Sequence, residues 1–566
     1  MMVFQRVVQA LSLLLFLVLL WLAAFPLISP FPVDFFLRTD PLVMTGAWLS
    51  TRVLIPVLGL AAVLLALTWI LGRFFCGMLC PMGTTIDVTD RWIRGKSSRK
   101  TEAKKGAETV AGAVRMRRIK YYLLCFVLGA AVFGVSLVFL AAPIPLITRF
   151  YGLLILPATA FLAELGLVAV RPAADYFDMT GLVYAQVEVA RFALQWFTVL
   201  FMGPIFALAV VSPRFWCRNL CPAGGLFAIF SRRPLIRRRV SEECIHCGKC
   251  RTSCPMAAIP EDPAATAHGE CIVCETCVRT CPVDAIRFSF KDQAGAAPDV
   301  QPVSRDRRRL ILAGAAGAGT AIVSITGLNY RPDREGTGQI LHAGLIRPPG
   351  ALPEHDFLNR CIRCGECMKV CPTNTLQPIG LTAGFYAFFS PRVTPRRGPC
   401  EPVCNACGQV CPTGAVRPLP PEEKQWAKLG TAYVLRHKCL AWEFDRECLV
   451  CDEVCPYNAI DLKSVEGQSV PVPFVYEHRC SGCGFCEHHC PVQAESAIVV
   501  EPMEALRLAE GSYRETARAI GLELRLSKSG EKESLSDPYG VSPGSETGGF
   551  DSGGLDDGGL PPGFTE

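Results

Sequence analysis

The sequence is poor in histidine, and none of its 8 histidines comes before His246. The apolar first part of the chain therefore has no imidazole that could ligate a b-type haem. A Cys-x2-Cys-His segment is also missing, so covalent attachment of a c-type haem is not supported. Together these absences exclude histidine-ligated haem as the electron carrier of this apolar region.

Dinucleotide binding is equally unsupported, and we find no flavin or NAD motif. The glycine-rich segment 314–319 lies in an apolar run after three arginines, without the preceding strand and later acidic residue of a dinucleotide-binding unit. The net charge of +6 comes with basic residues that crowd beside apolar segments. This pattern is typical of membrane orientation rather than of nucleic-acid binding.

Cysteine is abundant instead, with 29 residues. In a long chain with apolar runs, this number does not indicate a small disulfide-bonded secreted scaffold. Of these cysteines, 24 fall into six groups of four, and four more form two matched pairs. The remaining Cys125 lies in an apolar run, where we expect an inert core thiol.

Long apolar runs predict an α-helical membrane domain, because a helix needs about 20 apolar residues to cross a bilayer. Four runs are predicted to be the main transmembrane helices: residues 7–27, 53–71, 121–142 and 192–211. A fifth run at 151–170 contains Pro157 and Glu164, which allows a span, a re-entrant helix or an interfacial helix.

The distribution of charge orients these helices. The segment 91–120 carries 11 Lys and Arg residues, and five arginines lie between residues 232 and 239. Positively charged loops remain cytoplasmic, so we assign both segments to the cytoplasmic side. The run 151–170 is then predicted to lie outside without crossing, and the N-terminus to be cytoplasmic.

The rest of the chain is predicted to form α+β modules like those of bacterial ferredoxins, followed by a tail too polar to fold. The predicted domains are a polytopic membrane domain (1–240), a two-cluster module (241–292), a linker with a twin-arginine-like membrane anchor (293–330), a four-cluster domain (331–505), and a helical stub with a disordered tail (506–566).

The six groups of four cysteines have the spacing of [4Fe–4S] ligands, and each ends in Cys-Pro. Three thiolates come from a tight loop, and in two-cluster ferredoxins the fourth ligates the other cluster. The first module therefore predicts two ligand sets, which are Cys244, Cys247, Cys250 with Cys281, and Cys271, Cys274, Cys277 with Cys254. The alternative is structural zinc, which requires neither the third close cysteine nor the proline.

The second module contains four groups and brings the predicted number of clusters to six. The groups are Cys361, Cys364, Cys367, Cys371; Cys400, Cys404, Cys407, Cys411; Cys439, Cys448, Cys451, Cys455; and Cys480, Cys483, Cys486, Cys490. The middle two have a longer first gap than the outer two. The spacing leaves open which groups exchange their fourth ligands.

Two segments of the membrane domain repeat each other. Residues 73–83 and 214–224 are identical at seven of eleven positions, and each contains Cys-x3-Cys-Pro at the cytoplasmic end of a span. A pseudo-twofold relation between two such hairpins would bring four thiols together. These are Cys76, Cys80, Cys217 and Cys221. They could hold a seventh cluster, or they could be reduced thiols or redox-active dithiols at helix ends.

With these motifs, the chain resembles two ferredoxin-type proteins joined end to end. Residues 1–292 resemble the NapH or MauN type in their spans, paired cysteine motifs and two-cluster module, and residues 304–500 resemble the NapG or MauM type. The resemblance implies oxidation of membrane quinol and electron delivery to a periplasmic enzyme, as in nitrate reductase or methylamine dehydrogenase systems. Asp306 interrupts the arginines of the anchor and no small-residue cleavage site follows, so we expect an uncleaved anchor.

We therefore predict a multi-pass protein of the bacterial inner membrane, with two clusters in the cytoplasm and four in the periplasm. It would pass electrons from quinol to a periplasmic oxidoreductase or small carrier. Without histidine, a quinol site would use a carboxylate, a tyrosine or water. Candidate carboxylates near the outer face, none with a specific signal, are Asp34, Asp40, Glu164, Asp175 and Asp178.

A second functional class is a maturation or reactivation factor that donates electrons to a periplasmic redox enzyme. It would act in substoichiometric amounts and would affect the cofactor content of its partner. A redox sensor is a third class, but no DNA-binding, kinase or receiver pattern accompanies the cysteines.

Overall fold

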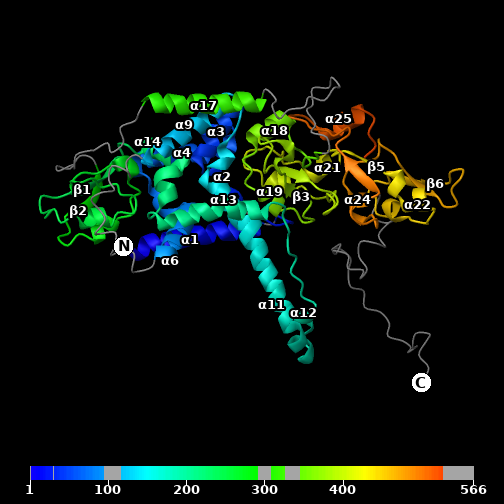
Figure 1. The fold of residues 1–566 in the computed structure, drawn as a ribbon, viewed down its shortest axis with the longest axis horizontal. Helices are drawn as coiled ribbons and strands as arrows, with labels where there is room; N and C mark the ends of the chain where they lie inside the picture. Colours follow the sequence, from blue (N-terminus) through cyan, green and yellow to red (C-terminus); the bar gives the residue numbers. More distant parts are fainter. Residues whose placement is uncertain are drawn as a thin grey trace, which may run out of the picture. The chain divides into compact units, whose positions relative to one another are not determined.

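The computed structural model describes residues 2–27, 29, 31–94, 116–290, 307–325, 345–524 and 526, which belong to one compact unit, Met1–Leu526 (Figure 1). Several predicted features lie outside the described residues. They are most of the basic segment 91–120, residues 293–306 and 326–330 of the linker and anchor, residues 331–344 of the four-cluster domain, and the tail beyond residue 526.

Apolar helices form the first part of the chain. They include α1 (Met2–Leu22), α4 (Gly59–Leu71), α9 (Ile119–Val132), α13 (Gln195–Ala207), and the continuous series α10 (Pro143–Arg149), η3 (Phe150–Ile155) and α11 (Leu156–Tyr176). The other helices of this part include α2 (Phe35–Arg38), α3 (Pro41–Thr51), α5 (Phe74–Met78), α6 (Pro81–Arg94), α12 (Thr180–Val183) and α14 (Pro222–Phe230). Leu20, Leu42, Ile144 and Phe227 belong to the core that these helices share.

Within the described residues, two helices are long and apolar enough to cross a membrane, Gln5–Leu22 and Pro143–Tyr176. The other three predicted spans correspond to shorter apolar helices at Pro56–Leu71, Ile119–Val132 and Gln195–Val210. Length therefore supports one of the four predicted main spans. The run 151–170, predicted not to cross, is part of the longest apolar helix, Pro143–Tyr176. Pro157 lies inside this continuous helix, just after the π-helical segment η3.

The two-cluster module contains one antiparallel sheet. Strand β1 (Ile236–Val240) pairs with β2 (Ile286–Phe290), and the short helices α15 (Lys249–Thr252), η6 (His268–Glu270) and α16 (Thr276–Arg279) lie between them in sequence. The sheet therefore begins before residue 241, because the arginine-rich segment at the end of the predicted membrane domain supplies its first strand.

The four-cluster domain has three more two-stranded antiparallel sheets among its described residues. They pair β3 (Leu376–Pro378) with β4 (Pro391–Val393), β5 (Thr431–Val434) with β8 (Ile498–Glu501), and β6 (Ile460–Lys463) with β7 (Val472–Val475). Its helices are α18 (Glu354–Arg360), α19 (Glu366–Lys369), α20 (Ala406–Gln409), α21 (Pro421–Lys424), α22 (Leu440–Phe444), α23 (Val450–Glu453), α24 (Phe485–His489) and α25 (Tyr513–Ala519).

The end of the described chain is part of this domain. Helix α25 packs against α21, and Ser512 Oγ donates a hydrogen bond to Glu423 Oε1 at 2.8 Å. Tyr513 and Leu524 are buried in the same core as the strands. The domain therefore extends beyond residue 505, because an apolar and hydrogen-bonded segment follows the last cysteine group.

The two ferredoxin modules contact opposite ends of helix α9. Near its start, Lys120 forms an ion pair with Glu270 of the two-cluster module. Just beyond its end, the carbonyl oxygen of Ser136 accepts a hydrogen bond from Arg363 of the four-cluster domain at 3.4 Å. The end of helix α1 also contacts the four-cluster domain, because Lys369 of that domain donates a hydrogen bond to the Trp21 carbonyl oxygen at 3.1 Å.

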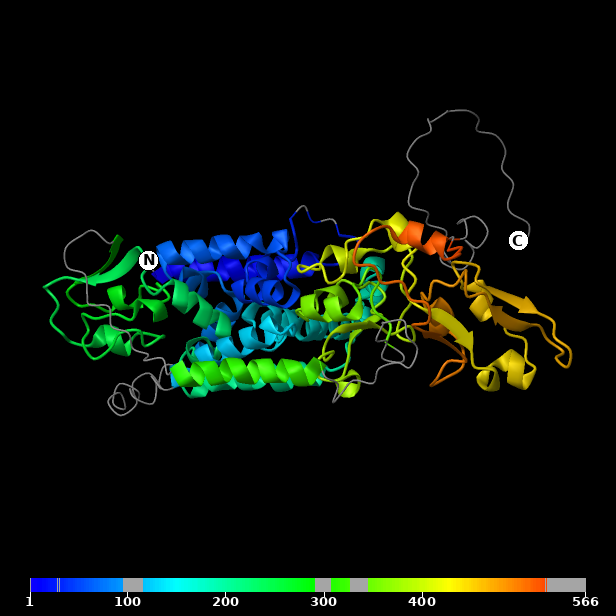
Figure 2. The same ribbon diagram turned by 90° about the horizontal axis from the view of Figure 1, so that it is seen from above.

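Helix α17 (Arg307–Ile325) packs along α9 through glycines (Figures 1 and 2). A Cβ atom at Gly317 would lie 2.0 Å from the Phe126 carbonyl oxygen, and one at Gly129 would lie 2.4 Å from the Gly314 carbonyl oxygen. Small residues at such positions allow close helix contact within a membrane. The glycines of 314–319 thus serve helix packing.

Two alanine substitutions in α17 should act with opposite sign. Gly317→Ala places a methyl group against the backbone of α9 and should destabilise the protein by about 1–3 kcal/mol. Gly319→Ala meets no atom within 4 Å, so its better helix propensity should stabilise the protein by up to about 1 kcal/mol. Thermal unfolding of the full chain in detergent measures both, and equal effects would contradict the packing.

Candidate iron–sulfur sites

Three hollows in the ferredoxin modules are each lined by four cysteines. In each hollow, three cysteines come from one group and the fourth comes from a neighbouring group. The sets are Cys271, Cys274, Cys277 with Cys254; Cys439, Cys448, Cys451 with Cys490; and Cys480, Cys483, Cys486 with Cys455. The last two groups of the second module therefore exchange their fourth cysteines.

The remaining groups show the same arrangement through electrostatic interactions between thiols. The interacting sets are Cys361, Cys364, Cys367 with Cys411, and Cys400, Cys404, Cys407 with Cys371. In the first module, Cys250 interacts with Cys244 and Cys247 and shares an apolar cluster with Cys281. The first two groups of the second module are thus also exchange partners, a pairing that the spacing left open.

The regularly spaced groups share an unusual loop backbone. In each, the residues on both sides of the second cysteine have positive φ, and these pairs are His246 and Gly248, Val273 and Glu275, Arg363 and Gly365, and Gly482 and Gly484. This conformation costs a residue other than glycine about 1–2 kcal/mol. Such strain persists only where the surrounding structure demands it, here in loops that turn three cysteines toward one centre.

Backbone N–H groups point at the sulfur atoms that follow these loops. The amide of Ala258 donates to Cys254 Sγ at 3.3 Å, and that of Ala459 donates to Cys455 Sγ at 3.3 Å. Hydrogen bonds of this kind stabilise a thiolate and tune a bound metal centre. The donor set therefore fits sulfur ligands that carry negative charge.

Crowding of thiols disfavours their ionisation. Burial, followed by the neighbouring thiols, raises the pKa of Cys451 to about 12, and burial chiefly raises the pKa of Cys483 to about 12. Binding of iron would replace these protons. Among the residues with assigned positions, no three His, Cys, Asp or Glu side chains converge as one metal ion requires; the thiols surround hollows, as a cluster requires.

The four cysteines of the repeated motifs also come together. Cys80 interacts electrostatically with Cys76, Cys217 and Cys221. Cys76 lies in α5 and Cys80 in the break before α6; likewise Cys217 lies in η5 (Trp216–Leu220) and Cys221 in the break before α14. Two equivalent segments thus supply two thiols each.

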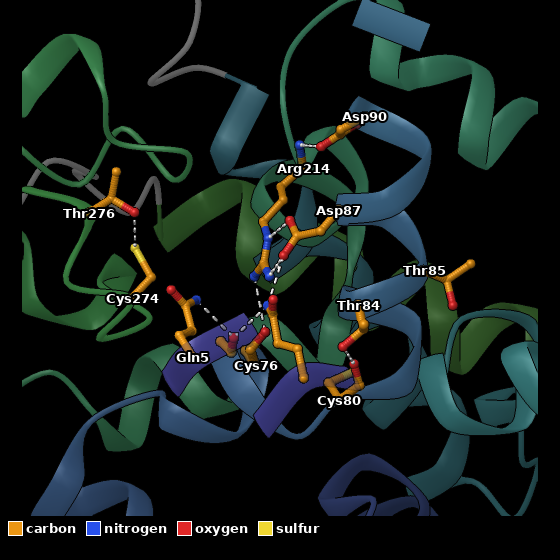
Figure 3. Close-up of polar contacts among 12 residues, drawn as sticks. Gln5, Cys76, Cys80, Thr84, Thr85, Asp87, Asp90, Arg214, Cys274 and Thr276 are labelled. Carbon is orange, nitrogen blue, oxygen red and sulfur yellow. Dashed lines mark hydrogen bonds and ion pairs between the residues drawn. The ribbon is translucent and has the colours of Figure 1, made fainter. Parts of the chain in front are cut away.

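The arginine that opens each motif reaches across to the other motif. Arg214 donates to the Cys76 carbonyl oxygen at 3.0 Å and forms a two-pronged ion pair with Asp87, with both N···O distances at 2.6 Å (Figure 3). In the reciprocal position, Arg73 Nη2 lies 3.0 Å from an ideal Cβ at Gly224. A side chain at Gly224 would displace Arg73, which explains why a glycine closes that motif.

The guanidinium of Arg73 retains free donors at this site. Its Nε and Nη2 atoms are buried and have no hydrogen-bond partner within the described chain. Arg73 also interacts electrostatically with Cys76 and Cys221. Unpartnered buried donors are costly, and the sulfur atoms of a cluster bound by the four thiolates would supply the missing hydrogen-bond acceptors.

A buried carboxylate joins the two-cluster module to the helices. Glu270 Oε2 pairs with Lys120 and lies 3.2 Å from Arg73 Nη1, while Oε1 accepts a hydrogen bond from Tyr121 at 3.0 Å. Burial opposes ionisation, but the charges of Lys120, Arg73 and Arg117 lower the pKa of Glu270 to about 2. Sequence analysis missed this residue, although its position directly before Cys271 marks it as a neighbour of a ligand loop.

The same junction places two cysteine sites side by side. Cys76 packs in one apolar cluster with Ile272, Cys254, Cys271 and Cys274. A Cβ atom at Gly77 would lie 2.3 Å from the Ile272 carbonyl oxygen, so only glycine permits this approach. The second site of the module therefore lies against Cys76 of the first repeated motif.

The predicted acidic candidates do not form one site. Asp34 pairs with Arg38 at 2.7 Å, Asp40 caps α3, and Glu164 pairs with Arg171 at 2.9 Å. Asp175 and Asp178 are exposed near the end of α11. Each therefore has an ordinary structural explanation.

Family models for iron–sulfur proteins match several parts of the chain. A "4Fe-4S binding domain" model matches residues 53–100 and 194–241, the two segments that contain the paired motifs. A "4Fe-4S dicluster domain" model matches 446–494, and further 4Fe-4S binding models match 357–377 and 244–258. The chain thus contains several [4Fe–4S] domains.

Curated relatives are ferredoxin-type proteins. The "Methylamine utilization ferredoxin-type protein MauM" of Methylorubrum extorquens is 34% identical over 217 residues, covering 36% of this chain and 92% of the relative. MauM of Paracoccus denitrificans is 38% identical over 185 residues, 30% of this chain and 76% of the relative. "Ferredoxin-type protein NapG" of Escherichia coli is 35% identical over 174 residues, 29% and 73% respectively.

Removal of the Glu270 charge should weaken the junction. Glu270→Gln leaves Lys120 and Arg73 buried without their counter-ion, which should cost about 3–5 kcal/mol. Denaturant titration of the iron-loaded full chain in detergent, followed by loss of visible absorbance, measures the change. Glu261→Gln is the control because Glu261 is exposed in the same module; equal stability of the two variants would contradict a structural role for Glu270.

Proposed function

Because this chain belongs to the family of ferredoxin-type proteins that includes MauM, we propose that it takes electrons from membrane quinol and passes them to a periplasmic oxidoreductase or small carrier. Ferredoxin-type electron transfer follows from the relatives and from the 4Fe-4S domains. The donor, the acceptor and the membrane location are the proposed parts. The acceptor system would resemble those of nitrate reductase or methylamine dehydrogenase.

The observation that carries this proposal is the contact of two ferredoxin modules with opposite ends of the same apolar helix. Lys120 near the start of α9 binds the two-cluster module, and Ser136 beyond its end binds the four-cluster domain. We propose that the helices cross the bacterial inner membrane, with two clusters in the cytoplasm and four in the periplasm.

The first part of the chain is proposed to be a NapH or MauN type unit fused to the NapG or MauM type unit. Its support is the match of one 4Fe-4S family model to both repeated segments. The crossed arginines and the gathering of four thiols at the two helix breaks agree with a duplicated unit. The proposed iron ligands are the 24 grouped cysteines, with a seventh cluster on Cys76, Cys80, Cys217 and Cys221.

This chain's own residues would prepare the seventh site. Arg73 and Arg214 would hold positive charge beside the thiolates, and Asp87 and Glu270 would keep these arginines in place. When bound, a cluster would supply one-electron transfer to its neighbours. Cys76 and Cys271 pack against the same apolar cluster, so the second site of the two-cluster module is the adjoining partner.

Iron content tests the seventh site. Four irons per cluster give about 28 irons per chain for seven clusters and about 24 for six. Replacement of both Cys80 and Cys221 by serine should lower iron by about four atoms per chain while the other clusters remain. Cys125→Ser is the control and should leave the iron content unchanged. Equal iron in the double variant and the wild type would refute the site, and zinc in the same assay would refute the cluster assignment.

Reduction by quinol tests the direction of flow. Menaquinol added anaerobically to the oxidised chain in detergent should bleach the cluster absorbance and produce the electron paramagnetic resonance signals of reduced clusters. Dithionite provides the control for full reducibility. Clusters that dithionite reduces and quinol does not would overturn quinol as donor and would favour a cytoplasmic donor, as in a maturation factor.

A further inference from the structure

Two arginines lie buried beside the first cysteine group of the four-cluster domain. Arg149 ends helix α10 and exposes 6% of its surface, and Arg363 lies between Cys361 and Cys364 and exposes 1%. Arg363 is also one of the residues with positive φ in the ligand loops, at 51°. The cysteine loop itself therefore determines the position of the Arg363 backbone.

Carbonyl groups and aromatic rings hold both guanidinium groups. Arg149 Nη2 donates to the Phe139 carbonyl oxygen at 2.5 Å, and its guanidinium lies 4.9 Å from the ring of Phe389. Arg363 donates to the Cys361 carbonyl oxygen at 3.2 Å and lies 3.9 Å from the ring of Phe139. These contacts position the charges, but dipoles and rings do not neutralise them.

No carboxylate forms an ion pair with either arginine in the described part of the chain. Glu354 is the carboxylate that interacts electrostatically with Arg363. Its ion pairs, however, are with Arg347 at 2.5 Å and Arg507 at 2.9 Å. The buried Glu366 faces Cys364 of the same group and interacts with Lys369, whose positive charge offsets that of Glu366. The groups that attract Arg149 are the thiols of Cys364 and Cys361.

The Nε atoms of Arg149 and Arg363 are buried and lack hydrogen-bond partners among the described atoms. By contrast, the two arginines at the membrane-domain cysteines have carboxylate partners, Asp87 and Glu270. Arginine keeps its charge in a protein interior. The Cys361 group therefore has two buried positive charges without carboxylate partners. The site of Cys76, Cys80, Cys217 and Cys221 has none.

Other sites of the four-cluster domain have a less positive environment. The Cys400 group faces Lys424 and Glu401, and Cys480 faces Lys428 and Glu477. The charged side chain beside Cys448 is Glu453. An electron added to a cluster makes it more negative, and a buried positive charge stabilises that reduced form strongly because the interior screens charge weakly. The two arginines should therefore favour reduction at one particular site.

We propose that Arg149 and Arg363 raise the reduction potential of the cluster held by Cys361, Cys364, Cys367 and Cys411 above those of the other clusters in its domain, so that this cluster, at the end of the helical bundle, is the first of the domain to be reduced. The proposal rests on the proposed function for the presence of the cluster. Both arginines act as positioning residues through their fixed charge. Their contacts with Phe139 and Ser136 tie this charge to the end of the helical bundle.

A redox titration of the iron-loaded full chain, followed by electron paramagnetic resonance, tests this assignment. Arg149→Gln should lower the midpoint potential of one component by about 59 mV or more. For one electron, this shift corresponds to a tenfold change in the equilibrium constant for reduction. Arg149→Lys should retain most of the wild-type potential. The control is Arg518→Gln, whose guanidinium lies 5.1 Å from the Trp426 ring, and it should shift no component.

The affected component must be the one that disappears in Cys364→Ala. Unchanged potentials in Arg149→Gln with full iron content would overturn the proposal, as would a shift in a component that persists in Cys364→Ala. If Arg149→Gln loses this cluster and Arg149→Lys keeps it, the requirement for charge is supported; loss in both variants overturns it. Failure of quinol reduction with these shifts intact would instead refute only the proposed donor.

Discussion

The structure depends on ionised side chains that are buried where the ferredoxin modules pack against the helices. At one end, the Glu270 carboxylate lies among Lys120, Arg73 and Tyr121, and none of these groups can return to water while the module stays in place. Breaking such a pair costs far more than a surface ion pair contributes. The ion pairs therefore fix the position of the two-cluster module on the helices.

The same constraint explains the repeated motif of the helical part. An arginine three residues before the first cysteine crosses to the opposite motif, and a glycine three residues after the second cysteine leaves room for it. Each motif is incomplete without the other. Four thiols, two arginines and two carboxylates then form one connected network rather than two helix ends that happen to be similar.

Much of the site could be predicted from spacing because the ligand loops are local. Three cysteines within seven residues determine a tight turn, and the loop conformation at Val273 and Glu275 follows from that turn. The partner of each fourth cysteine in the second module could not be predicted, since Cys411 and Cys490 reach their sites only through the folded domain. The helices were harder still, because composition identifies an apolar run but tertiary packing decides where its helix starts and stops.

Residue types and short-range spacing were enough to identify the class of cofactor, the likeness of the two repeated motifs and the number of cysteine groups. Only the folded chain shows the surroundings of Glu270, Arg149 and Arg363, whose sequence neighbours do not distinguish them from other charged residues. Their partners come from segments more than a hundred residues away or from carbonyl groups and rings. A buried charge has meaning only in relation to the atoms that surround it, and folding alone assembles those atoms.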